Sequence, residues 1–225
     1  MQLLGWRNTS TDIKRPIVWA VLGFFVYFAG VVIGDIAQGV LAPPLSLGWG
    51  QQIFGALFVF GFAKLIGRST GILALKEPTG LWPFWMVLVV ILIVGASQLA
   101  GGMLGLSPEA HGVEYFAYQA TMPGLSEELG FRGLLLGLLF CALRRHTQAG
   151  WAALLAVVLA ALPFGALHLF EYSGREFLIV FTFTAFAGIL LGGLRLVSGS
   201  LWPSILAHNV ANVLIGVVDM VLLSG

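Results

Sequence analysis

Seven long apolar stretches constrain the fold of this chain more than any other feature of its sequence. A helix that crosses the hydrocarbon core of a bilayer needs about 20 mostly apolar residues. Backbone groups in hydrocarbon must be paired internally, and continuous apolar runs of this length favour helices over the alternating strands of a barrel. The predicted spans are Pro16 to Gly34, about 49–66, about 82–105, a stretch that ends at Arg144, about 150–170, about 177–194 and about 200–222.

The composition of the chain supports the same interpretation. Of its 225 residues, 59% are hydrophobic and 9% are charged, whereas a soluble domain carries about 25% charged residues. We therefore predict an all-α, polytopic transmembrane helical bundle. It forms a single integral membrane domain over residues 1–225, with its polar motifs within about 115–222. The net charge of +1 gives no indication of a nucleic-acid partner. The apolar composition makes the lipid bilayer the expected surrounding.

The distribution of lysine and arginine predicts how the bundle is oriented. Basic residues precede the first span, separate the second from the third, follow the fourth and lie at the end of the sixth. With seven spans, all of these lie on one side, and basic residues concentrate on the cytoplasmic side of membrane proteins. The N-terminus is therefore expected in the cytoplasm. The first span is too long for the apolar region of a signal peptide, so we interpret it as a retained anchor.

Two glutamates and an arginine interrupt the fourth predicted span, in the pattern Glu127-Glu128-x-x-x-Arg132. Glu128 and Arg132 are four residues apart on one helical face, with the acid N-terminal, which favours an ion pair. Glu127 lies about 100° around the helix from Glu128 and can point elsewhere. Pro123-Gly124 just upstream breaks or starts the helix. It places Glu127 near a positive dipole end, which helps to keep the carboxylate ionised, as a general base must be.

Two further polar sites lie in the last third of the chain. Phe164 and His168 are four residues apart, so the phenyl ring is expected to pack against the imidazole. His208 and Asn212 also share a helical face, whereas Asn209 faces away from Asn212. A single histidine in an apolar helix is often a hydrogen-bonded core residue, and the whole set could be a polar network that only fixes packing. Ionisable residues inside membranes nevertheless indicate function, and three such sites in one bundle favour a functional centre.

The three polar sites resemble, in order and spacing, the signature motifs of the CPBP family of intramembrane proteases. This family includes the type II CAAX prenyl endopeptidases and the bacterial bacteriocin-processing or self-immunity (Abi) proteins. The resemblance covers about residues 123–213, and the first hundred residues carry no motif. The matching motifs are Glu127-Glu128-x-x-x-Arg132, Phe164-x-x-x-His168 and His208-x-x-x-Asn212.

The resemblance implies a role for each motif residue. Glu127 would activate the attacking water. Its implied partners in the catalytic centre are Glu128, Arg132, His168, His208 and Asn212. The resemblance also implies a membrane-anchored protein or peptide as the substrate, with or without a lipid, and a location in the plasma (inner) membrane of a bacterium.

Two mechanisms suit these residues. In the metal-free mechanism, Glu127 takes a proton from water, and His208 and Asn212 donate hydrogen bonds to the oxyanion. His168 then helps Glu127 to hold the water. In the alternative, His168, His208 and a carboxylate bind zinc with one position open for water. The chain has no H-E-x-x-H motif, so the cofactor stays open between zinc and none, and we favour the metal-free mechanism.

The depth of Glu127 in the membrane limits both mechanisms. If the fourth helix began at Ser126, Glu127 would lie at the outer boundary, while His208 would lie about 12 Å from the inner one at about 1.5 Å per residue. The two side chains could not meet. We therefore predict that residues 115–126 enter the membrane as a half-helix, broken at Pro123-Gly124, beside a water-filled cavity. The membrane face to which this cavity opens stays undecided.

Three other interpretations of the polar residues are weighed against the protease. Carboxylates and histidines also build proton relays, so a proton-coupled transporter is one alternative, although the two halves hold no matched pair of interrupted helices. A non-catalytic bacteriocin-immunity membrane protein is the second, because it would retain the same fold. A serine hydrolase is disfavoured, because Ser126 lacks the glycine pattern of a nucleophile elbow and suits capping or packing.

Overall fold

The computed structural model describes residues 14–42, 47–66, 73, 84–93, 112–168 and 175–224, and within these residues all regular structure is helical. The predicted all-α class is therefore confirmed. The helices are α1 (Pro16–Leu41), α2 (Trp49–Leu65), a helix at Phe84–Ile93, α4 (Val113–Gln119), α5 (Met122–Glu127), the π-helix η2 (Glu128–Leu135), α6 (Leu136–Leu143), α7 (Ala149–Leu167), α8 (Arg175–Ser198) and α9 (Trp202–Ser224).

Within the described part of the chain, four helices are long and apolar enough to cross a membrane, which makes the chain a polytopic integral membrane protein. They lie at Pro16–Leu41, Ala149–Leu167, Phe177–Ser198 and Trp202–Val221. The helix α2 has 17 residues, one fewer than the 18 that the four helices above all reach. The fourth predicted span is a row of shorter helices and also falls below this length. A helix nevertheless occurs at each of the seven predicted spans. Of the third predicted span, only Phe84–Ile93 lies within the described residues.

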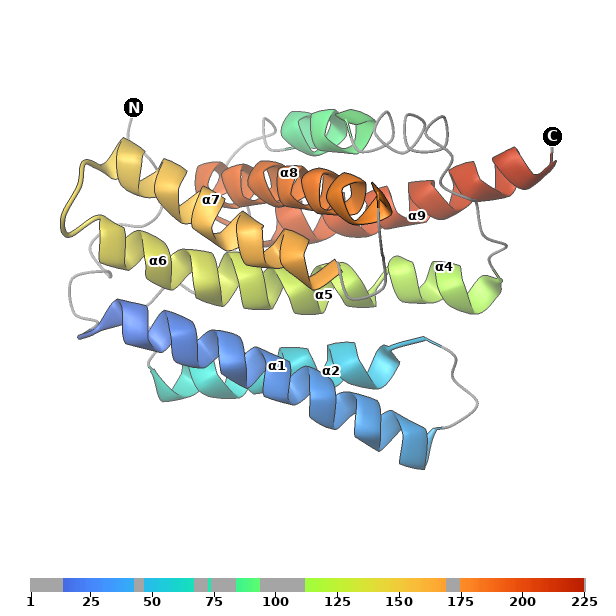
Figure 1. Cartoon of the computed structure of the whole chain (residues 1–225), viewed down its shortest axis with the longest axis horizontal. Helices are drawn as coiled ribbons and strands as arrows, with labels where there is room; N and C mark the ends of the chain where they lie inside the picture. The colour runs from blue at the N-terminus through green and yellow to red at the C-terminus, as the bar shows by residue number, and fades with distance from the viewer. Residues whose placement is uncertain are drawn as a thin grey trace.

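The row of helices α4, α5, η2 and α6 runs along the middle of the molecule (Figure 1). The hairpin of α1 and α2 lies on one side of the row, and α7, α8 and α9 lie on the other. The π-helix η2 contacts α1, α2, α7 and α8. The charged motif therefore sits at the centre of the bundle and not on its lipid-facing surface.

The helices α1 and α2 approach each other closely at two glycines. A Cβ atom added to Gly34 would lie 2.1 Å from the carbonyl oxygen of Gly50, so only glycine fits there. At the end of the hairpin, the Gln38 side chain accepts a hydrogen bond of 2.7 Å from the Gly50 amide. The first helix extends to Leu41, beyond the predicted end at Gly34, and Gln38 in this extension holds the start of α2.

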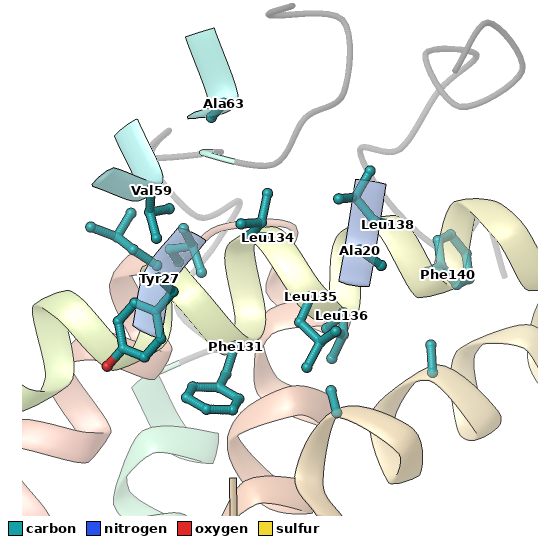
Figure 2. Close-up of a cluster of buried hydrophobic side chains, with 14 of the residues drawn as sticks. Ala20, Tyr27, Val59, Ala63, Phe131, Leu134, Leu135, Leu136, Leu138 and Phe140 are labelled. Atoms are coloured by element: carbon teal, nitrogen blue, oxygen red, sulfur yellow. The ribbon is translucent and has the colours of Figure 1, made fainter. Parts of the chain in front are cut away.

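Apolar side chains from η2 and α6, packed against those of α1, α2 and α7, form the main core (Figure 2). Leu136 and Leu138 have no exposed surface. Phe131 packs edge-on against Tyr27 of α1 and against Phe164 of α7. A second, smaller cluster joins the helix at Phe84–Ile93 to α8 and α9. The main core thus encloses η2 from both sides of the bundle.

The break before the charged motif differs in position from the prediction. It lies between the end of α4 at Gln119 and the start of α5 at Met122, and not at Pro123-Gly124. Pro123 stands in the first turn of α5, where the fixed φ of proline fits a helix and its missing N–H is not needed. The proline therefore starts the second segment, and the chain turns just before it.

The segment after α5 is a π-helix over Glu128–Leu135 and not the ordinary α-helix that the spacing predicts. The amide of Leu136 bonds to the carbonyl of Phe131, five residues earlier. The wider turn still allows Glu128 and Arg132 to meet. Such turns are rare and often mark functional sites.

Candidate active site

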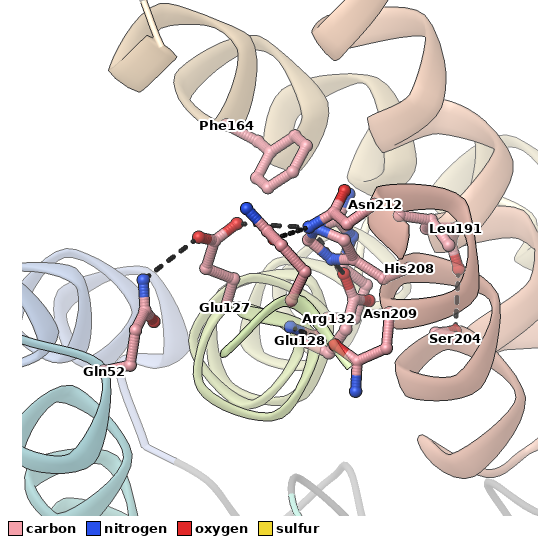
Figure 3. A network of polar contacts seen from close by, with 12 residues as sticks. Gln52, Glu127, Glu128, Arg132, Phe164, Leu191, Ser204, His208, Asn209 and Asn212 are labelled. Carbon is pink, nitrogen blue, oxygen red and sulfur yellow. Dashed lines mark hydrogen bonds and ion pairs between the residues drawn. The ribbon is translucent and has the colours of Figure 1, made fainter. Parts of the chain in front are cut away.

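Glu128 and Arg132 form a buried ion pair at the centre of the site (Figure 3). Their side chains are 0% and 2% exposed, and Nη1 lies 3.0 Å from Oε1. Neither Nη atom of Arg132 makes a hydrogen bond within the described residues, so the contact is an ion pair without hydrogen-bond geometry. The guanidinium also lies over the Phe164 ring, 4.0 Å from its centroid. The predicted pairing across one helical turn is confirmed.

His208 of α9 lies between the two carboxylates. Its Nδ1 is 2.9 Å from Oε1 of Glu128, and its Nε2 is 3.8 Å from Oε2 of Glu127. An ionised carboxylate can only accept, so the hydrogen of this bond belongs to Nδ1. Glu128 therefore fixes the orientation of the ring, and Nε2 faces Glu127.

Glu127 has a more open environment than Glu128. Its side chain is 16% exposed, and its Oε1 accepts a hydrogen bond of 3.3 Å from Nε2 of Gln52 on α2. Its buried Oε2 has no hydrogen-bond partner in the part of the chain that the structure describes. Oε2 of Glu128 likewise has no hydrogen-bond partner among the described residues. The two carboxylates differ in that Glu128, with no exposed surface, is held by Arg132 and His208, whereas Glu127 is partly exposed.

His168 and Asn212 are each held by one hydrogen bond. The Nδ1 atom of His168 lies 2.9 Å from the carbonyl oxygen of Phe164, and the two rings pack edge-on at 5.0 Å, which confirms the predicted Phe164–His168 contact. Asn212 donates from Nδ2 to Oε1 of Gln119 on α4 at 2.9 Å. If Nδ1 of His168 donates to the carbonyl, Nε2 of the neutral ring is an acceptor.

His168, His208 and Asn212 line one cavity of about 100 Å³. Most of its other walls are apolar side chains from α8, α9 and the helix at Phe84–Ile93. Glu127 does not line this cavity and is connected to it through His208, which contacts both. The structure therefore brings the predicted residues into one neighbourhood but does not place all of them on one wall.

Besides Gln119, two further residues that the sequence analysis did not select hold the site together. Asn209, which it had set aside, accepts a hydrogen bond of 2.8 Å from the Gly124 amide and donates one of 3.4 Å to the Thr121 carbonyl. It thereby fixes the start of α5. The other is Gln52, for which the only signal in the sequence is an amide within an apolar stretch.

The zinc alternative requires His168, His208 and a carboxylate to converge on one point. Among the residues that the structure describes, no group of three or more histidine, cysteine, aspartate or glutamate side chains is arranged to hold a metal ion. Both ring nitrogens of His208 face carboxylates, and Nδ1 of His168 faces a backbone carbonyl. These residues do not fit a zinc site, so no step below involves a metal.

One comparison with known proteins bears on this site. A family model described as type II CAAX prenyl endopeptidase Rce1-like matches residues 109–214. This range contains all three polar motifs, and α1 and α2 lie outside it. No curated protein and no solved structure matches the chain.

Proposed function

Because the chain belongs, through residues 109–214, to the Rce1-like family of type II CAAX prenyl endopeptidases, we propose a specific reaction for its buried site. The protein hydrolyses a peptide bond of a membrane-associated protein or peptide, with a water activated by Glu127. The contact of Glu127 and Glu128 with the two nitrogens of His208 is the main support for this proposal.

Glu127 is the general base of this reaction. Its Oε2 has no hydrogen-bond partner among the described residues and can accept the proton of an attacking water. After the attack, the same oxygen can return that proton to the leaving amine. Acid–base catalysis by one positioned side chain typically contributes a factor of about 10² to 10⁴ in rate.

Asn212 and His208 stabilise the oxyanion that forms on the scissile carbonyl, His208 as an imidazolium, because only the doubly protonated ring can donate from Nε2 while Nδ1 donates to Glu128. Glu128 accepts the hydrogen of Nδ1 and orients the ring, as the carboxylate does in carboxylate–histidine pairs of other hydrolases. Asn212 has two amide hydrogens, of which Gln119 takes one, and the second, which has no partner among the described residues, can donate to the oxyanion. Each donor in such a site typically contributes about 3 kcal/mol to transition-state stabilisation.

The cavity beside His208 suits a substrate that is delivered from the bilayer. His168 and Asn212 provide polar groups on one wall, and apolar side chains such as Phe183, Phe186 and Ile215 form much of the rest. An apolar group next to the scissile bond could occupy this volume. We propose that the substrate is anchored in the membrane, and that a prenylated peptide is one candidate because of the family to which the chain belongs.

Cleavage of defined peptides by the purified protein in liposomes tests the proposal. One probe is a farnesylated peptide with a C-a-a-X ending, and the other is an unprenylated transmembrane peptide. We expect the wild type to cleave at least one of them, and Glu127→Gln to lose about 10³-fold in rate. Glu114→Gln, on α4, is the matched control and should retain the wild-type rate.

Mass spectrometry of the products measures the outcome. Undiminished cleavage by Glu127→Gln would remove the assigned base. Stoichiometric zinc in the pure, active protein would refute the metal-free mechanism. Proton flux through the liposomes, with neither peptide cleaved, would replace the protease with the proton-coupled transporter.

A further inference from the structure

We propose that Gln52, on α2 and outside the matched family region, is a positioning residue for Glu127. The inference rests on the proposed function, because it concerns the orientation of the general base. Figure 3 shows Gln52 on one side of Glu127 and His208 on the other. The N-terminal hairpin of α1 and α2, which carries no motif, thereby contributes to the site.

Close packing of α2 against α5 brings Gln52 to the site. A Cβ atom added to Gly55 would lie 2.9 Å from Oγ of Ser126 and 3.0 Å from the Tyr27 ring, so the missing side chain allows this approach. Gln52 precedes Gly55 by three residues and lies on the same helical face. Its side chain is buried, with 9% of the residue exposed.

The amide of Gln52 fixes the orientation of the Glu127 carboxylate, so that one oxygen faces Gln52 and the other faces His208. Nε2 of Gln52 donates to Oε1 at 3.3 Å, and this leaves Oε2 at 3.8 Å from Nε2 of His208. The terminal torsion of a glutamate is broad, so the carboxylate could turn freely without such a donor. An ionised carboxylate only accepts hydrogen bonds, so the amide must present its NH₂ group.

The carbonyl oxygen of the Gln52 side chain argues against a purely structural role for this residue. Oε1 of Gln52 is buried and has no hydrogen-bond partner among the described residues. An unsatisfied buried acceptor is costly, and an apolar side chain of the same shape would avoid that cost. Its neighbour Gln51 differs, because it donates to Oδ1 of Asp35 at 2.8 Å on the exposed side of the hairpin. Gln51 is therefore a matched control.

The first test compares Gln52→Met with Gln51→Met in the cleavage of the two peptide probes. Methionine has nearly the same size as glutamine but no donor. We expect Gln52→Met to lower kcat about tenfold with KM unchanged, because substrate binding does not involve this contact. Gln51→Met should match the wild type. Gln52→Asn keeps the amide, but its shorter side chain withdraws the amide from Glu127, so it should lower kcat as Gln52→Met does. It replaces Gln52→Met in the test if that variant fails to fold.

The second test needs no substrate. Dicyclohexylcarbodiimide modifies carboxyl groups, and in the wild type the N–H of Gln52 occupies Oε1 of Glu127. Without this hydrogen bond, we expect Glu127 to be labelled about fivefold faster in Gln52→Met than in the wild type or Gln51→Met. Glu128, buried and ion-paired, should stay unlabelled and is an internal control. Fragment mass spectrometry separates the two neighbouring glutamates.

The two tests separate the failure of this inference from the failure of the proposed function. Equal labelling and equal kcat in Gln52→Met and the wild type would overturn the positioning role alone. Cleavage that survives Glu127→Gln would overturn the proposed base, and with it the catalytic meaning of the contact. Faster labelling of Glu127 together with a lower kcat in Gln52→Met supports the inference.

Discussion

Replacement of Arg132 by methionine tests whether the buried ion pair with Glu128 holds the bundle together. The variant keeps an unbranched side chain of similar length but removes the charge. Glu128, with no exposed surface, would then retain only His208 as a polar partner among the residues that the structure describes. The contact of the guanidinium with the Phe164 ring, at 4.0 Å, is lost as well.

The size of the effect follows from the burial of the pair. Removal of one partner from a buried ion pair typically costs about 3–5 kcal/mol. Because Nδ1 of His208 still donates to Glu128 at 2.9 Å, we expect the lower end of this range for Arg132→Met. For a chain of this length, about 3 kcal/mol lowers the unfolding midpoint by about 10 °C.

The only cysteine of the chain provides the assay. Cys141, on α6, is 1% exposed, so a fluorogenic maleimide reacts with it when the bundle opens. The midpoint of this reaction during heating in detergent micelles measures stability. Lys64→Met, on the exposed end of α2, is the control and should shift the midpoint by less than about 2 °C.

A double-variant cycle provides the result that could refute the reasoning. Glu128→Gln leaves Arg132 as an unpaired buried charge, so it should also cost about 3 kcal/mol. In the double variant neither charge remains, and its loss should be well below the sum of the single losses. Additive effects would mean that the two side chains do not stabilise each other.

Two further predictions concern residues that hold the site in place. In Gly124→Ala, the new Cβ atom would lie 2.3 Å from Oδ1 of Asn209. Helix α5 must therefore shift, and the cleavage rate should fall at least tenfold. Gly61→Ala is the control and should keep the wild-type rate, because its Cβ atom meets nothing within 4 Å. In Gln119→Leu, Asn212 loses its hydrogen bond of 2.9 Å. Steady-state kinetics should show a severalfold lower kcat, while the thermal unfolding midpoint stays unchanged. An unchanged kcat would mean that Asn212 needs no such partner.

Local spacing predicts those parts of the site that lie on one helix. The Glu128–Arg132 pair and the Phe164–His168 contact each join residues four apart. Helical geometry alone brings such residues together, whatever packs around them. The same spacing does not predict the π-helix at Glu128–Leu135, because the alternative hydrogen-bond pattern depends on the surroundings of the helix.

Contacts between helices are the part that spacing could not predict. The hydrogen bonds of Gln52 with Glu127, Gly124 with Asn209, and Gln119 with Asn212 join residues 75, 85 and 93 positions apart. A single side-chain amide in an apolar helix gives no sequence signal of its hydrogen-bond partner, because that partner depends on which faces of two helices meet. The sequence analysis accordingly left Gln52 and Gln119 out of the site and set Asn209 aside.

Apolar runs of membrane-spanning length and a few charged residues among them were sufficient to establish a helical membrane protein and to select its candidate functional residues. Water is absent from hydrocarbon, so this conclusion requires no knowledge of how the helices pack. Packing alone determined that Glu128, and not Glu127, binds His208 at 2.9 Å, and that Oε2 of the partly exposed Glu127 lies 3.8 Å from Nε2 of that ring. Two adjacent carboxylates of the same chemistry differ only in the helices that surround them, and those helices come from distant parts of the chain.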